Sequence, residues 1–133
     1  LPGKAASHTR PVDLGGIRVP MTMTAANVDD VTFAVGVAEL PDAIKAITAL
    51  PAMKAAMVRN IGGSIRRESA SAAGISPMTI DIEATGNNGY GQQLLIARFI
   101  AQDTRAYQLV VVGKEKNISR EAVDTFFTSF KPS

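Results

Sequence analysis

The sequence has no cysteine and one histidine, and each shortage excludes a class of chemistry. Without cysteine the chain cannot form a disulfide, a thiolate nucleophile or a zinc–thiolate site. The one histidine, His8, lies in a polar N-terminal stretch, and the sequence places no catalytic or metal-binding partner beside it. We therefore expect no metal site and no cofactor, and an enzymatic role is the less favoured one.

Aromatic residues and excess charge are also scarce. Aromatic side chains make up 5% of the chain, which leaves few rings on which nucleic-acid bases could stack. The 14 basic and 12 acidic residues give a net charge of +2, which indicates no particular polyanionic partner. Two short basic clusters, Arg66-Arg67 and Lys114/Lys116, accompany no nucleic-acid-binding motif and fit ordinary solvated surface. We expect no nucleic acid partner.

Long apolar runs are missing as well. No stretch approaches the roughly 18–20 apolar residues that a membrane-spanning helix needs, so we expect no integral membrane segment. The sequence begins at Leu1 rather than at methionine, which suggests either a removed signal peptide or an artificial boundary. The first alternative, which we prefer, predicts a periplasmic or secreted protein.

What is present is an ordinary globular composition, with 46% hydrophobic and 20% charged residues. No internal repeat or low-complexity tract divides the 133 residues. The length predicts a single domain, residues 1–133, in which residues 1–9 form a loosely ordered lead-in.

The C-terminal third carries the clearest structural signal. Residues 94–101 and 107–113 are almost continuously apolar, which is typical of central strands covered on both faces. A helix then begins at Ser119, a natural N-cap, and carries one apolar stripe. The stripe consists of Val123, Phe126, Phe127 and Phe130. We expect this helix to lie across an antiparallel pair formed by the two strands.

The N-terminal half predicts three strands and helical sequence, and the first strand is a short extended piece at residues 11–14 before the turn signal Gly15-Gly16. Residues 17–24 alternate between apolar and polar, and Pro20 favours an edge position for this strand. Residues 31–38 have small side chains on one face, which suits close approach by a helix. Residues 43–61 are rich in helix formers, and Pro51 predicts either two helices that meet there or one kinked helix.

The segment after this helical sequence completes the predicted sheet. Residues 64–69 are polar and indicate an edge strand, whereas residues 78–84 alternate cleanly. Asn88-Gly89 is a strong hairpin signal that joins the strand 77–85 to the strand 92–102. The order is three strands, a helix, four strands and a helix. It predicts an α+β fold with an antiparallel sheet of six or seven strands and helices packed on it.

This layout resembles the PsbP-like fold, shared by extrinsic photosystem II subunits and a Ran-binding nuclear import factor. It is more similar to small exported bacterial domains of unknown function. The matching residues are Leu1-Pro2-Gly3, Phe33-Ala34-Val35-Gly36-Val37, Gly89-Tyr90-Gly91-Gln92-Gln93, Arg98, Tyr107 and Phe126-Phe127-Thr128-Ser129-Phe130-Lys131. The resemblance implies a fold and an exported, non-enzymatic role. Gln93 stands where such bacterial domains often carry glutamate, so no acidic role transfers to it.

Arg98 is the most informative candidate for a binding site. It interrupts an apolar strand between Ile96 and Ile100, where a charge needs a partner or access to water. One interpretation is a structural arginine with a packed stem and a paired head. The other is a small anionic pocket on that face of the sheet. The candidate ligand-binding residues are Arg98, Tyr107, Tyr90 and Asn88.

Three functional hypotheses remain open. The first is a non-enzymatic module that binds an unidentified protein partner or anchors a complex. The second is a binder of a small anionic or amphipathic ligand, which would use Arg98, Tyr107 and the methionines Met53 and Met57. The third is a hydrolase that uses Asp81 and Glu83, although solvated strand positions also explain these carboxylates. A large pocket lined by Arg98 would favour the second hypothesis, and a broad exposed apolar patch the first.

Overall fold

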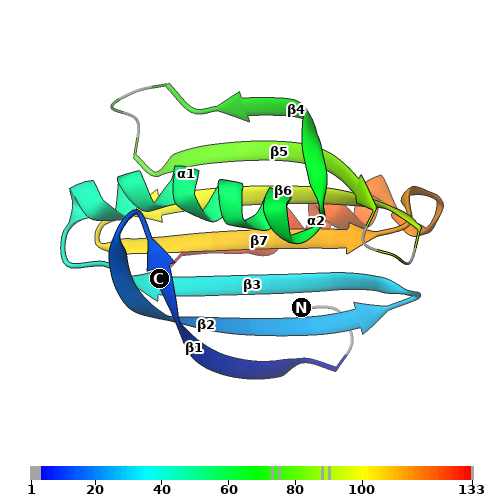
Figure 1. Cartoon of the computed structure of the whole chain (residues 1–133), viewed down its shortest axis with the longest axis horizontal. Helices are drawn as coiled ribbons and strands as arrows, with labels where there is room; N and C mark the ends of the chain where they lie inside the picture. Colours follow the sequence, from blue (N-terminus) through cyan, green and yellow to red (C-terminus); the bar gives the residue numbers. More distant parts are fainter. Residues whose placement is uncertain (1–3, 73, 75, 88, 90, 133) are drawn as a thin grey trace.

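The protein forms one seven-stranded antiparallel sheet with a helix on each face, as Figure 1 shows. The computed structural model describes residues 4–72, 74, 76–87, 89 and 91–132. The elements in chain order are β1 (Ala6–Leu14), β2 (Ile17–Val28), β3 (Val31–Glu39), α1 (Ala43–Asn60), β4 (Gly63–Ala70), β5 (Met78–Asn87), β6 (Gln92–Gln102), β7 (Arg105–Gly113), the 3-10 turn η1 (Glu115–Asn117) and α2 (Arg120–Ser129). The predicted α+β class is confirmed.

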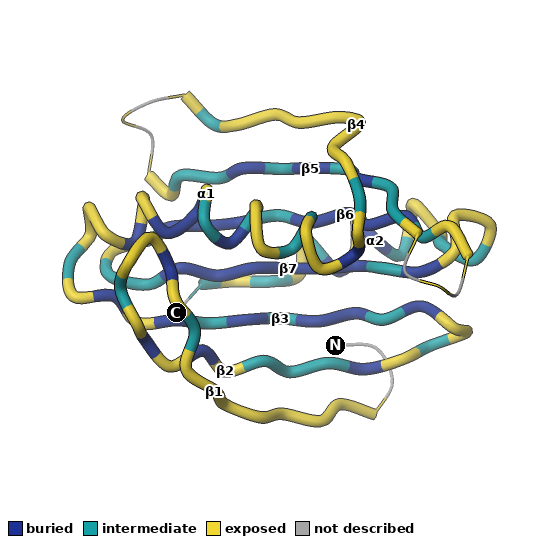
Figure 2. Tube along the Cα trace, viewed as in Figure 1, coloured by how far each residue is buried: buried dark blue, intermediate teal, exposed yellow. Residues whose placement is uncertain are grey.

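The strand order across the sheet is β1-β2-β3-β7-β6-β5-β4, and every neighbouring pair is antiparallel. β6 and β7 therefore lie near the centre, as their continuous apolar runs predicted. Side chains of β6 alternate between the two faces, so that Phe99 packs under α1 and Ile100 packs on the α2 side. Figure 2 shows that the buried positions concentrate in β3, β7 and β6, whereas β1 and β4 are exposed.

Helix α2 begins and packs as its sequence predicts. The Ser119 hydroxyl accepts a hydrogen bond from the backbone N–H of Ala122 at 3.2 Å. Val123 and Phe126 are buried against the sheet, and the Phe126 ring meets Phe33 edge-on with the centroids 5.4 Å apart. Phe127 and Phe130, the other two members of the stripe, are half-buried on the same side.

Helix α1 is a single helix, so the predicted alternative of two helices meeting at Pro51 is wrong. Pro51 has no N–H to donate to the carbonyl of Ile47, one helical turn earlier. Because Pro51 is exposed, water can donate a hydrogen bond to that carbonyl instead. The helix starts at Asp42, whose carboxylate accepts the N–H of Lys45 at 2.8 Å. Among the described residues, no helix is long and apolar enough to cross a bilayer.

The position of Pro20 corrects the expectation that its strand lies at a sheet edge. β2 is flanked by β1 and β3, and Pro20 lies opposite Pro11 of β1. Because neither proline has an N–H, the two form a non-hydrogen-bonded pair, in which the backbone polar groups point away from the partner strand. The β2–β3 register ends at Met21, one residue later, so the missing donor of Pro20 breaks no bond to β3.

The edges are β1 and β4. β4 confirms the predicted polar edge strand, whereas β1 begins at Ala6 and so includes residues that we expected in the loose lead-in. The last four residues of that expected lead-in, from Ala6 to Thr9, pair with β2. The predicted hairpin between β5 and β6 is confirmed by the pairing of Asn87 with Gln92. Asn88, on which the predicted turn depended, lies outside the described residues.

Candidate functional site

The structure supports the structural interpretation of Arg98. Its Nε and Nη2 donate to the two carboxylate oxygens of Asp81 at 2.8 and 3.1 Å, an ion pair with two parallel hydrogen bonds. The guanidinium also lies over the ring of Phe127 in α2, 5.1 Å from the ring centroid. The hydrogen bonds to Asp81 raise the pKa of Arg98. Arg98 thus links β5 and α2.

Of the other predicted ligand-binding residues, those that the structure describes do not join Arg98 in one pocket. Tyr107 is buried under Phe130, with the ring centroids 5.4 Å apart, and its hydroxyl interacts with Arg105. Asn88 and Tyr90 lie outside the described residues. Met53 and Met57 belong to α1 and pack on the opposite face of the sheet from Arg98. The expectation that they share a pocket with Arg98 is therefore wrong.

Glu83 is held by arginines rather than solvated. It accepts hydrogen bonds from Arg120 of α2 at 2.9 Å and from Arg66 at 3.4 Å, and Arg67 lies 3.8 Å away. The hydrogen bond from Arg120 is the main reason that the pKa of Glu83 is lowered. Asp81 is paired with Arg98, so both predicted hydrolase carboxylates are neutralised by cations.

A β-bulge explains why two consecutive arginines reach one carboxylate. Consecutive residues of a regular strand point to opposite faces of the sheet. The β4–β5 register shifts by one residue between Ile65 and Arg67, so Arg66 is the additional residue. Both Arg66 and Arg67 then contact Glu83, and Arg66 also reaches Glu115 at 3.3 Å. Arg66 and Arg67 are therefore exposed but paired, rather than the ordinary solvated surface that the sequence predicts.

These charges surround a small cavity on the α2 side. It has a volume of about 240 Å³ and lies between β4, β5, β6 and α2. Its charged lining residues are Arg67, Arg98, Arg120, Asp81, Glu83 and Asp124. The three cations and three anions balance, so this cavity is not the anionic pocket that Arg98 suggested.

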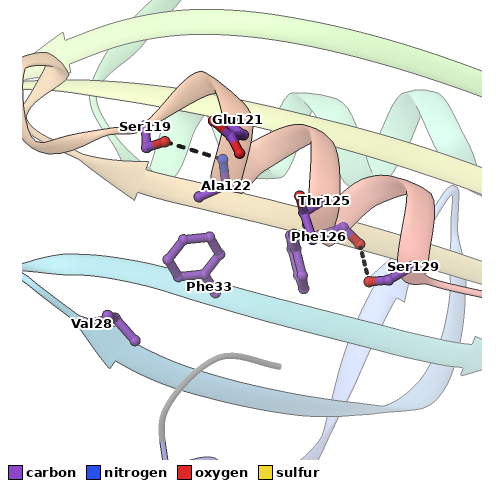
Figure 3. A pocket seen from close by; sticks show the side chains of 8 residues that line it. All are labelled: Val28, Phe33, Ser119, Glu121, Ala122, Thr125, Phe126 and Ser129. Atoms are coloured by element: carbon purple, nitrogen blue, oxygen red, sulfur yellow. Dashed lines mark hydrogen bonds between the residues drawn. The ribbon is translucent and has the colours of Figure 1, made fainter.

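A larger groove lies on the same face of the sheet, between α2 and the strands β2 and β3. We call it the α2 groove. Its volume is about 460 Å³, and Figure 3 shows its lining residues. The lining consists of Val28, Phe33, Ser119, Glu121, Ala122, Thr125, Phe126 and Ser129. The rings of Phe33 and Phe126 meet at its centre, and polar α2 side chains form its rim.

The α2 groove exists because one helix cannot cover the whole face. A helix is about 10 Å wide, whereas neighbouring strands are about 4.8 Å apart, so α2 covers roughly two or three of the seven strands. Beyond Phe33 this face of β2 and β1 carries hydroxyl pairs, with Ser7–Thr24 at 2.7 Å and Thr9–Thr22 at 2.8 Å. The sequence predicted the apolar stripe that contains Phe126, but it did not predict the groove that Phe33 and Phe126 line.

The charged residue that lines the α2 groove is an acidic one, Glu121. Glu121 lines it from the first turn of α2, and Val28 at its other wall is followed by Asp29 and Asp30 in the β2–β3 turn. Within the part of the chain that the structure describes, none of these three carboxylates forms an ion pair. The groove itself is lined by no lysine or arginine among the described residues. Its electrostatics therefore favour an occupant with a positive charge.

Other surfaces give weaker candidates. Among the described residues, the large exposed apolar side chains are Ile44 and Ile47 on α1 and Ile65 on β4. Three isoleucines on two elements do not form the broad apolar patch that would mark a protein interface by itself. The open edge of β1 is interrupted by Pro11, whose nitrogen faces away from β2 and offers no donor.

Comparison with known proteins shows a similar fold. No protein-family model matches the chain, and no curated protein matches it. The crystal structure of a Pseudomonas aeruginosa protein of unknown function, described as a putative regulator, is similar with a TM-score of 0.56. The match covers 95% of this chain and 98% of that protein at 9% sequence identity. The chain thus shares its overall fold with a protein of unknown function.

Proposed function

We propose that the chain is a non-enzymatic binding module that holds an apolar segment of a protein partner in the α2 groove. The observation that carries this proposal is the groove itself, with a volume of about 460 Å³ and the rings of Phe33 and Phe126 at its centre. Cavities of roughly 300–1,000 Å³ lined mainly by apolar side chains with a few polar groups are typical binding sites.

The charge around the groove defines the chemistry of the partner. An apolar side chain would displace water from the aromatic floor, and a lysine or arginine next to it would meet Glu121 on the rim. Asp29 and Asp30 follow Val28 in the chain, and neither forms an ion pair in the described part of the chain. We therefore favour a segment that combines apolar and basic residues.

The alternatives have less support. The small-ligand hypothesis depended on Arg98 and Tyr107, yet Arg98 is paired with Asp81 and Tyr107 is buried under Phe130. The hydrolase hypothesis needs one carboxyl group with a raised pKa to act as the acid. The pKa of Glu83 is lowered instead, because Arg120 donates to it.

A peptide selection tests the proposal with a matched pair of variants. The purified protein is used to select from a phage-displayed library of random peptides, and affinities are measured by fluorescence anisotropy. Thr125→Arg fills the groove from an exposed position on its rim, whereas Thr128→Arg places the same side chain on α2 outside the groove. Selected peptides should be rich in apolar and basic residues and should lose about tenfold or more in affinity with the first variant only.

Two outcomes would overturn the proposal. One is a selection that yields no peptide with measurable affinity for the protein. The other is a set of peptides that bind Thr125→Arg and Thr128→Arg equally well, which would place the binding surface elsewhere. A thermal melt of each variant shows whether the fold is intact, which is expected because both threonines are exposed.

A further inference from the structure

Methionine sulfur is concentrated on one side of the sheet, under α1. The chain has five methionines and no cysteine, so thioethers are its only soft ligands. Met21 of β2 and Met53 and Met57 of α1 line one cavity of about 260 Å³. Met23 lies two residues along β2, on the same face of the sheet as Met21. The fifth, Met78, begins β5 and does not line the cavity.

A buried amide connects Met23 to the same cavity. Gln108 of β7 lines it and is 6% exposed, which makes it the buried polar side chain of the described core. Its Nε2 donates to the Met23 sulfur at 3.3 Å, so this amide contacts both Met23 and the cavity that Met21, Met53 and Met57 line. Gly36 lies between them in β3, and its lack of a side chain leaves the space in which they meet.

We propose that this cavity, which we call the methionine cavity, binds a soft monovalent cation of the Cu(I) class through the thioethers of Met21, Met53 and Met57. Thioethers select Cu(I) over hard cations, and methionine has three rotatable bonds with which to turn its sulfur toward a guest. The charged residue in the lining is Asp13, whose carboxylate accepts a hydrogen bond from the N–H of Gly16 at 2.8 Å, so the proposal rests on the thioethers alone. Met57 is half-buried, so solvent reaches its side chain.

This site is distinct from the α2 groove, because the sheet lies between them. It also differs from an oxygen or imidazole site. Among the described residues, no group of three or more His, Asp or Glu side chains is placed to hold a metal ion. His8 lies opposite Met23 in the β1–β2 register, but its Nε2 accepts a hydrogen bond from Nη2 of Arg10 at 2.9 Å. We therefore assign His8 no role in the site.

Silver(I) is the probe, because it has the closed-shell charge and softness of Cu(I) without its sensitivity to oxygen. The whole chain, labelled with ¹³C at the methionine methyl groups, is titrated with silver nitrate in chloride-free buffer. The methyl signals of Met21, Met53 and Met57 should shift together and saturate at one silver ion per chain, whereas Met78 should not move. An absence of shifts would overturn the proposal, as would equal shifts at all five methionines.

Leucine variants locate the binding. Met57→Leu is nearly isosteric at a half-buried position. Loss of a residue that only supports a metal ligand typically weakens metal binding by about 10–100-fold, and loss of the Met57 thioether should weaken silver binding by at least as much. Met78→Leu and His8→Asn should leave the affinity unchanged. Equal affinity of Met57→Leu and the unsubstituted chain would overturn the proposal, and so would loss of binding in His8→Asn.

Discussion

The side chain of Gln108 donates a hydrogen bond to the sulfur of Met23 across the empty position of Gly36. The three residues lie in one row across β7, β3 and β2, and the Nε2–Sδ distance is 3.3 Å. A methyl group at position 36 would lie 2.5 Å from the Met23 sulfur and 2.8 Å from Cγ of Gln108. The absence of a side chain at Gly36 therefore allows the buried Gln108 amide to reach the Met23 sulfur.

We predict that Gly36→Ala lowers the free energy of unfolding by about 1–3 kcal/mol, the usual cost of overpacking a core. In a strand without this crowding, alanine would instead be favoured over glycine. Urea denaturation measures the change. The double variant Gly36→Ala/Met23→Ala removes the closest atom, so its loss should be smaller than the sum of the single losses by about 0.5 kcal/mol or more. Strict additivity would contradict the crowding.

Phe126→Ala should be among the most damaging single substitutions on the α2 side. The ring is 7% exposed and meets Phe33 edge-on, so its removal should lower the free energy of unfolding by about 3–5 kcal/mol. Thr128→Ala on the exposed side of the same helix should change it by less than about 0.5 kcal/mol. Similar losses for the two variants would show that α2 is not held by its aromatic stripe.

The ion pairs of Glu83 predict a pH-dependent contribution to stability. Arg120 lowers the pKa of Glu83 in the folded protein, so the folded state favours the ionised carboxylate. The stabilisation is therefore complete above the pKa of the unfolded chain and is lost as the pH falls through the lower pKa of the folded protein. Glu83→Gln should be less stable than the unsubstituted chain at neutral pH, and the difference should shrink toward zero in acid.

Urea denaturation of both proteins between pH 7 and the acid limit of folding measures this difference. Added salt should also reduce it at neutral pH, because Arg120 and Arg67 are largely exposed. A difference that stays constant down the pH range would mean that Glu83 contributes through packing rather than charge. Glu68→Gln in β4, whose carboxylate contacts Lys54, serves as the comparison at an edge position.

The sequence predicted those parts of the fold that depend on short-range periodicity. The α2 stripe through Phe126 and the continuous apolar run of β7 are each patterns within a single element, so the spacing of neighbouring residues is enough to predict their burial. Proline was less informative. Pro20 suggested a sheet edge and Pro51 a helix break, yet Pro20 breaks no bond to β3, and the helical bond that Pro51 removes lies on the exposed side of α1.

The candidate sites were largely beyond prediction, because they depend on contacts between distant segments. Gln108 and Met23 are 85 residues apart in the chain, and only the register through β3 brings them together. The bulge at Arg66 likewise changes the face of the sheet on which an arginine side chain lies, and no glycine or proline in the sequence indicates its position. The α2 groove follows from the width of the sheet relative to that of one helix, which needs the strand order to be known.

The opposed prolines of β1 and β2 bear on how copies of this protein meet in a crowded solution. Pro11 presents a nitrogen without hydrogen to the outside of the sheet, and the opposite border of the sheet is bent by the bulge and carries Arg66, Arg67 and Glu68. Neither border offers the regular ladder of backbone groups on which a fibril elongates. Contacts between copies of the protein would therefore form through side chains on the two broad faces of the sheet, whose identities can make such contacts specific.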